Sequence, residues 1–363
     1  MNFKSKNVIL IIGNGFDLAH NYKTSYNDFA NYIIENILTP AIINSNIHKY
    51  EGGLIREHFI KNLNDNMTNN SGNELGSFVN RIIFYKVRKL DSGISDTLKE
   101  FSSEIKKIIS NAFLGKLFND QYENWFDIEN AYFSELVSIE EKYTTLRQKK
   151  VVIKTLNSDL EEIKSILINY LRSIETERND LINTFFRSEW FDNLEYAYVL
   201  NFNYTNSIEN YFQPSKHVKI NYIHGNLDSH NIVFGYGNDQ HSKYGIIKET
   251  GIDEYLKYFK TFQYLNDKKY NEIYDLALQH FEDYDVLIIG HSLGQTDKTL
   301  LKEILDNDKC QRIHIFKRSD LNDNSIGLKE EFNKLIFSIS RIIDNEKDLR
   351  VKVLNFEDSQ FFP

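Results

Sequence analysis

A short apolar run followed at once by two glycines, near the start of the 363-residue chain, most constrains its fold. Residues 8–12 read VILII, which is typical of a strand buried on both faces of a sheet. Gly13 and Gly15 follow, and the next residues can begin a helix. Because a glycine turn between a strand and a helix lets a phosphate approach the backbone, this pattern predicts an α/β fold with a phosphate crevice.

The glycine pattern does not complete the dinucleotide fingerprint of dehydrogenases. Leu18 occupies the position of the third glycine, and no strand ending in an acidic residue follows at the expected distance. We therefore disfavour a dehydrogenase. For residues 13–15, phosphate binding and a plain tight turn on a central strand both remain open.

Charge and composition exclude several classes of protein. The net charge of −9 argues against general affinity for nucleic acid backbones. The single cysteine, Cys310, excludes an internal disulfide framework and a metal site with several cysteine ligands. The first residues lack the pattern of a signal peptide, and no apolar run approaches the roughly 20 residues of a membrane span. We expect a soluble, cytoplasmic protein with no membrane association and no metal site.

Strand-like and helix-like segments alternate in the second half of the chain. Strands are predicted at residues 195–201, 218–223, 232–234, 285–289, 312–317 and 349–354, with helices at 253–281, 296–305 and 328–343. This alternation favours a mainly parallel, Rossmann-like sheet with helices on both faces. We predict an α/β core of residues 1–30 and 191–363, with a helical insertion, 31–190, after the first βα unit.

The insertion reads mostly as helix. Helices are predicted at residues 27–38, 78–87, 94–113 and from 120, a polar loop region at 43–75, and an antiparallel helical hairpin at 134–186. Asp127 and Glu129 lie beside Trp125 in this part of the chain. Most such acidic pairs are solvated charges at a helix end, and a role as acid or base in a site is the alternative.

Two polar stretches at predicted strand ends carry candidate catalytic side chains. Asn201, Asn203 and Asn206 fall within six residues, more amides than a single helix cap needs. His224 ends a strand before a glycine, and the pKa range of histidine suits proton transfer near neutral pH. We favour a site role for His224 and for at least one asparagine over capping and structural hydrogen bonding.

Residues 290–294 match G-x-S-x-G, the nucleophile elbow of serine hydrolases. That chemistry needs an acid and then a histidine further along, but His314, the only histidine after His291, falls in the next predicted strand. We therefore disfavour a Ser292 hydrolase and interpret the stretch as a second glycine turn that can hold a phosphate or ribose. Asp297 can cap the following helix or bind a hydroxyl group.

Together, these motifs resemble those of the AbiH family of bacterial abortive-infection proteins. The resemblance is carried by IIGNGFDLAHNYKTSYNDF, WFDIE, NFNYT, IHGNLD and GHSLGQTD, in that order. It implies a role in defence against bacteriophage.

The layout is also similar, more distantly, to the sirtuin-like NAD-cleaving domains of bacterial defence systems. Their Thr-Asn-Tyr-Asp segment resembles residues 202–205, and their His-Gly pair resembles residues 224–225. Phe202 and Thr205 depart from that segment, and one cysteine cannot supply the four zinc ligands of deacetylating sirtuins, so deacetylation is disfavoured.

The sirtuin resemblance implies that Asn203 holds ribose or water, that His224 acts on a ribose hydroxyl, and that the glycine turns line the diphosphate and adenosine. His224 and Asn203 are thus the predicted catalytic residues. The predicted nucleotide contacts are Gly13, Asn14, Gly15, Phe16, Asp17, Thr24, Ser25, Tyr204, Gly225, Gly290, His291, Ser292 and Asp297.

We therefore predict a defence enzyme that cleaves the nicotinamide–ribose bond of NAD, or of a related nucleotide, and stays inactive until infection. Amides and an imidazole can stabilise the oxocarbenium-like transition state, so no cofactor is expected. A phage-derived trigger and a homo-oligomer are compatible with this hypothesis. The alternative is a module that senses ADP-ribose or another nucleotide through a partner, and the acidic charge disfavours a nuclease.

Overall fold

The computed structural model describes residues 3–38, 111–117, 125–187, 191, 193–212, 217–228, 232–318 and 325–363. The predicted helix at 78–87 and the polar region at 43–75 lie outside these residues, as does nearly all of the helix predicted at 94–113. The chain divides into two compact units, Met1–Thr24 with Leu171–Pro363, and Ser25–Tyr170. The predicted domain boundaries, 31–190 for the insertion, stay a prediction.

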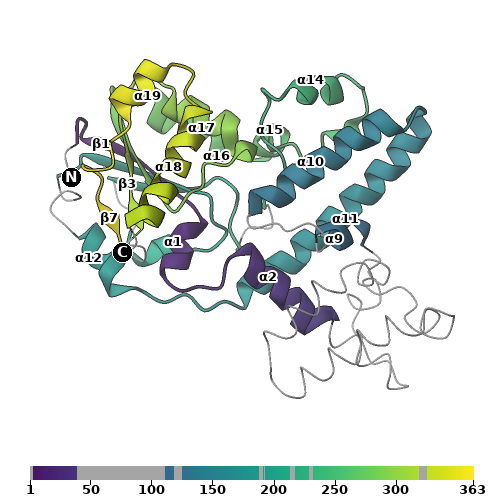
Figure 1. Cartoon of the computed structure of the whole chain (residues 1–363), viewed down its shortest axis with the longest axis horizontal. Coiled ribbons are helices and arrows are strands. Elements are labelled where there is room, and N and C mark those ends of the chain that lie inside the picture. Colours follow the sequence, from purple (N-terminus) through teal and green to yellow (C-terminus); the bar gives the residue numbers. More distant parts are fainter. Residues whose placement is uncertain are drawn as a thin grey trace. The chain divides into compact units, whose positions relative to one another are not determined.

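The first unit is built on a five-stranded sheet with the strand order β3-β2-β1-β4-β5 (Figure 1). All four pairings between neighbouring strands are parallel. The strands are β1 (Asn7–Ile12), β2 (Tyr196–Asn201), β3 (Val218–Tyr222), β4 (Tyr284–Ile289) and β5 (Cys310–Ile315). The predicted Rossmann-like α/β class is confirmed.

Helices cover both faces of the sheet, which explains why β1 is apolar at nearly every position. Ile9 and Ile11 pack into one apolar cluster with residues of α16–α18, and Val8, Leu10 and Ile12 pack into another with α1 and α12. Successive side chains of a strand point to opposite faces, so both faces need apolar residues. In Figure 1, helices α16–α19 lie on one side of the sheet, with α1 and α12 on the other.

The helices of this unit are mostly short. They are α1 (Asn14–Ala19), α12 (Asp180–Phe186), α14 (Ser242–Lys248), α15 (Lys260–Gln263), α16 (Lys269–Ile273), α17 (Lys298–Leu305), α18 (Ser325–Ser340) and α19 (Glu346–Lys352). Single turns are η2 (Ser207–Asn210), η3 (Asp253–Tyr255), η4 (Tyr264–Asn266), η5 (Tyr274–Gln279) and η6 (Gln295–Asp297). A two-residue pair, β6 (Lys317–Arg318) and β7 (Phe361–Phe362), runs parallel.

Three predicted elements differ from the structure. Residues 349–354 lie mostly in helix α19, not in a strand, because the Asn345 side chain accepts the Lys347 N–H and caps the helix. Residues 232–234 form no ladder; instead, the Val233 N–H donates to the His224 carbonyl. The helix predicted at 253–281 is a series of short turns, η3, α15, η4, α16 and η5.

The described residues of the second unit are helical, as predicted for the insertion. They form α2 (Tyr26–Ile33), η1 (Ile34–Leu38), α9 (Ala112–Leu117) and α10 (Trp125–Lys142), and α11 (Leu146–Arg172) continues two residues past the boundary. The helices α10 and α11 form a hairpin, in which the Tyr132 hydroxyl donates to Asn157 at 2.6 Å. None of the helices in the described part of the chain is both long and apolar enough to cross a membrane.

Candidate functional site

The strand order creates a switch point between β1 and β4. The chain leaves β1 toward β2 and β3 on one side and returns to β4 and β5 on the other. Open α/β sheets bind their ligands at such a point, beyond the carboxyl ends of the strands. Residues 13–16 and 290–297, the two predicted glycine turns, follow these two strands and meet there, where the Gly15 N–H donates to the Gly290 carbonyl at 2.8 Å.

The glycines of these turns permit backbone-to-backbone packing. Gly290 has a φ of +68°, and a Cβ there would lie 2.2 Å from the Phe16 nitrogen. A Cβ on Gly13 would lie 2.5 Å from the His291 Cα. The N–H groups of Gly15 and Phe16 donate to carbonyls within the protein, so these two amides are occupied. Contact of the turns with a nucleotide stays a prediction.

Three other predicted contact residues have defined roles in the fold. The Phe16 ring is fully buried in the apolar cluster below α1. The carbonyl of Thr24, itself buried, accepts the Asn14 side-chain amide at 3.1 Å. Ser25 belongs to the second unit and begins α2 with a capping box, in which Ser25 and Asp28 each accept the other's backbone N–H at 3.1 Å.

Asp17 ties α1 to the segment that follows β2. Its buried carboxylate accepts hydrogen bonds from the Thr205 hydroxyl at 2.6 Å and from the Ser207 hydroxyl. Burial raises the pKa of Asp17 to about 6, although the hydrogen bonds oppose the shift. The sequence marked this residue as a ligand contact, and in the structure it joins two of the predicted site segments.

The raised pKa of Asp17 predicts a pH dependence of stability. The folded chain binds the proton more tightly than the unfolded chain, so about 3 kcal/mol of stability is lost as the pH rises from about 4 to about 6. We expect Asp17→Asn to remove this loss, as measured by urea unfolding across that range. The control is Glu330→Gln, at an exposed position of α18, which should leave the dependence unchanged. If Asp17→Asn keeps the wild-type dependence of stability on pH, Asp17 is not the group responsible for it.

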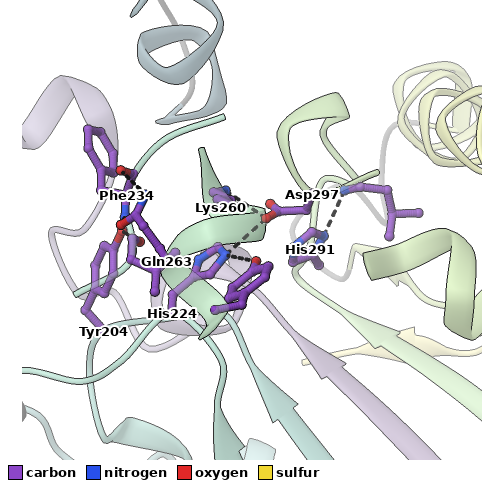
Figure 2. Close-up of polar contacts among 10 residues, drawn as sticks. Tyr204, His224, Phe234, Lys260, Gln263, His291 and Asp297 are labelled. Carbon is purple, nitrogen blue, oxygen red and sulfur yellow. Dashed lines mark hydrogen bonds and ion pairs between the residues drawn. The ribbon is translucent and has the colours of Figure 1, made fainter. Parts of the chain in front are cut away.

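A cluster of buried polar side chains lies beyond the ends of β3 and β4. Asp297, at the end of η6, accepts a hydrogen bond from the Lys260 ammonium at 2.7 Å. The same carboxylate oxygen, Oδ1, lies 3.0 Å from Nε2 of His224. Figure 2 shows dashed lines that join the Asp297 carboxylate to both partners. Asp297 was predicted to cap α17 or to bind a hydroxyl, but its side chain makes no cap hydrogen bond.

The charges of this cluster fix the proton on His224. Burial alone would raise the pKa of Asp297, but Lys260 and His224 outweigh burial and hold that pKa far below its usual range. An ionised carboxylate only accepts hydrogen bonds, so Nε2 of His224 carries the proton. Nδ1 of His224 and Oδ2 of Asp297 make no hydrogen bond to any described residue. In the neutral imidazole, Nδ1 is therefore available as an acceptor, as is Oδ2.

His291 is a neutral donor beside this cluster. Burial lowers the pKa of His291 to about 4, although Asp297 opposes the shift. Nδ1 of His291 accepts the Leu293 N–H at 2.9 Å, so its proton lies on Nε2. That N–H donates to no described residue. The end of β4 therefore offers a donor close to the two acceptors.

Aromatic rings enclose the two histidines. The Phe202 ring lies edge-on to His224, with centroids 5.0 Å apart, and to His291 at 4.3 Å. The Tyr264 ring stacks beside His224, and its hydroxyl lies 3.3 Å from Nε2. The Tyr204 hydroxyl donates to the Val233 carbonyl at 3.0 Å. These rings keep water away from the cluster and so strengthen its electrostatic interactions.

Asn203, the second predicted catalytic residue, joins the end of β2 to the first glycine turn. Its side-chain amide donates to the Gly13 carbonyl at 3.0 Å, and its backbone N–H donates to Asn201. Gly225 follows His224 in a turn with a φ of +80°. The structure thus brings His224, His291 and Asp297 together, and it places Asn203 beside the neighbouring turn. Their contacts with a nucleotide stay predictions.

Lys260 is the residue that the sequence did not predict. It begins α15 within an irregular segment, so helical periodicity gave no signal. Its stem passes over Gly237, where a Cβ would lie 3.1 Å from the Lys260 Cβ and Cδ and 2.5 Å from the Thr296 carbonyl. Gly237 in the stretch FGYGN was the only local sign of a close approach.

The geometry around Ser292 does not form a hydrolase triad. Ser292 is exposed, and the non-glycine residue with positive φ in this stretch is Leu293, at +56°. His314 instead pairs with Asp285 at 3.5 Å, near the start of β4. Within the described ranges, no histidine donates to or accepts from the Ser292 hydroxyl. These contacts agree with the preference against a Ser292 hydrolase.

Other polar features do not coincide with the cluster. A cavity of about 330 Å³ is lined by His20, Tyr22, Glu175, Glu177, Arg178 and Asn179. A second of about 350 Å³ lies beside β5 and is lined by His314, Arg312 and the segment near the C-terminus. Asp127 and Glu129 lie on α10 in the second unit, where the Glu129 side chain is buried. Their role as acid or base stays untested.

The sheet order, the helices on both faces and the polar cluster at the carboxyl edge define an α/β protein of Rossmann-like architecture. The family model described as Bacteriophage abortive infection AbiH matches residues 9–318. The chain therefore belongs to the AbiH family and is a bacteriophage abortive infection protein, as its motifs indicated. No curated protein and no solved structure matches the chain significantly.

Proposed function

We propose that the chain acts in phage defence by cleaving the bond between nicotinamide and ribose in NAD, or the corresponding bond of a related nucleotide. The observation that carries this proposal is the state of His224. It donates from Nε2 to an ionised carboxylate and leaves Nδ1 without a hydrogen bond to any described residue, at the ligand-binding edge of the sheet.

The proposed reaction is a hydrolysis. The C1′–N1 bond breaks, and its electron pair leaves with nicotinamide. A water oxygen forms the new bond to C1′, and the water proton passes to Nδ1 of His224, giving ADP-ribose and nicotinamide. Oδ2 of Asp297 accepts a hydrogen bond from a ribose hydroxyl group. The carboxylate also places negative charge near the developing oxocarbenium ion. Water is the only co-reactant, so the proposal needs neither a metal nor a redox cofactor.

The burial of the cluster supports a site that opens on activation. His224 and Asp297 are 6% and 8% exposed, and neither lines the two cavities described above. A nucleotide that reaches them must displace part of the enclosing chain. We therefore include in the proposal a trigger that accompanies infection, such as a phage component or assembly of several copies.

The decisive experiment is an assay of NAD cleavage. Purified protein, alone and with lysate of phage-infected cells, is incubated with NAD, and released nicotinamide is measured by chromatography. We expect the amount of released nicotinamide to increase when the infected lysate is added to the protein. The lysate without the protein should release none. No release under any condition, with full phage defence in cells whose NAD level stays constant, would contradict the proposal.

A second candidate is a nucleotide-sensing module that acts through a partner. The N–H groups of Gly15 and Phe16 and the charges of Lys260 and Asp297 are already paired within the protein, so these groups can support the fold without acting on a substrate. Calorimetry with ADP-ribose and NAD separates the two candidates. Binding without turnover, in the presence of infected lysate, would favour sensing over cleavage.

A further inference from the structure

A buried lysine and a histidine share one oxygen of Asp297. The Lys260 ammonium lies 2.7 Å from Oδ1, and Nε2 of His224 lies 3.0 Å from that atom (Figure 2). The Lys260 side chain is 1% exposed, so its charge does not reach a ligand directly. The ion pair with Asp297 is a contact through which this charge can act on the neighbouring groups.

We propose that Lys260 is a positioning residue that fixes the tautomer of His224 by keeping Asp297 ionised. The expected effect of Lys260 on turnover rests on the proposed function. The expected effect on the tautomer of His224 does not, because it concerns the ligand-free protein. Lys260 was not among the site residues predicted from the sequence. It lies 37 residues from Asp297 along the chain.

The surrounding backbone holds Lys260 in place. Its N–H donates to the Tyr236 carbonyl at 2.9 Å, and the Tyr236 N–H donates to the Tyr258 carbonyl. Gly237 leaves room for the lysine stem, and the Gly237 carbonyl accepts the Thr299 N–H from α17. The lysine is therefore anchored to the two segments that also place Asp297 at the start of α17.

The groups that face Asp297 show why the lysine charge is decisive. They are Lys260 from α15, His224 after β3 and His291 after β4, and the Tyr264 hydroxyl from η4 approaches the histidine. His291 is neutral, and the Lys260 ammonium forms the ion pair with Asp297. Burial favours the protonated acid, and without the lysine Asp297 would take up a proton more readily.

A protonated Asp297 would reverse the hydrogen bond with His224. The acid would donate its proton to Nε2, and the imidazole proton would move to Nδ1. The nitrogen proposed to accept the water proton would then be a donor. Loss of Lys260 therefore disables His224 as a base without removing any atom of the histidine.

The test follows the tautomer of His224 by NMR in ligand-free protein labelled with ¹⁵N-histidine, with the resonance assigned by its loss in His224→Gln. At neutral pH the wild type should show the Nε2–H tautomer, and Lys260→Met should show Nδ1–H. Lys260→Arg keeps the charge and should retain the wild-type signal. If Lys260→Met fails to fold, Lys260→Gln, which keeps a hydrogen-bond donor but no charge, should show the same shift. An Nε2–H signal, or a doubly protonated ring, in both neutral variants would overturn the proposal.

Turnover provides a separate readout. If the chain releases nicotinamide, Lys260→Met should lower kcat by about 100-fold, the range of a lost general base, with KM nearly unchanged. A tautomer shift without nicotinamide release from the wild type would contradict the proposed function and leave the role of Lys260 supported. Nicotinamide release that is equal in wild type and both neutral variants would overturn the role of Lys260 alone.

Discussion

Replacing His224 with alanine is expected to lower nicotinamide release from NAD by about 100-fold or more, the usual contribution of a general base. The reason is geometric. Nδ1 of His224 is an acceptor without a partner among the described residues, and the ionised Asp297 holds the ring in that tautomer. The measurement is the initial rate of nicotinamide release by activated protein at saturating NAD.

The matched control is His217→Ala, because His217 is exposed and lies before β3, at the opposite end of that strand. We expect this control to keep the wild-type rate and thermal stability. The His224 variant should unfold cooperatively as well, since Lys260 still pairs with the Asp297 carboxylate in that variant. A folded His224→Ala protein that releases nicotinamide at the wild-type rate would contradict the assigned role.

Replacing Gly290 with alanine should destabilise the chain by about 3 kcal/mol or more, a large share of the 5–15 kcal/mol typical of a folded domain. Two costs combine at this position. The φ of +68° is strained for a residue with a Cβ, and that Cβ would lie 2.2 Å from the Phe16 nitrogen. Backbone atoms cannot move aside as a flexible side chain can. The measurement is the free energy of unfolding in urea.

Two glycines of the same chain separate these costs. Gly251 has a φ of +69°, but a Cβ added there would meet nothing within 4 Å, so Gly251→Ala measures the backbone strain alone, about 1–2 kcal/mol. Gly245 lies inside α14 with open space around it, and Gly245→Ala should stabilise the chain by about 0.5–1 kcal/mol. Equal losses for Gly290→Ala and Gly251→Ala would show that the close approach of the two turns costs nothing.

The sequence alone predicted the five strands of the sheet, together with two that do not form, and most of the residues of the candidate cluster. Residues 8–12 and 285–289 predicted buried parallel strands, and both are central in the sheet. Because the carboxyl ends of parallel strands meet at one edge, polar residues after different strands were expected to converge. His224, His291 and Asp297 do converge, although His224 and Asp297 are 73 residues apart.

Local patterns were misleading where capping or irregular backbone decided the structure. The apolar residues of 349–354 alternate as in a strand, but the Asn345 cap and the acidic residues behind it favour helix α19. The segment 253–281 has helical composition, yet its helices are interrupted. Intrinsic propensities of ordinary residues differ by less than about 1 kcal/mol each, so local patterns alone do not choose between the alternatives.

Sequence periodicity thus determined the strands, their parallel arrangement and the edge at which polar residues gather, because these follow from alternation along a short stretch. Only the tertiary structure decided that the Lys260 ammonium pairs with the Asp297 carboxylate and that the glycines let the backbones of the two turns come into contact. Such pairings join segments that are distant in the sequence. Their free energy depends on burial and on the separation of charges, and neither is encoded in any local pattern.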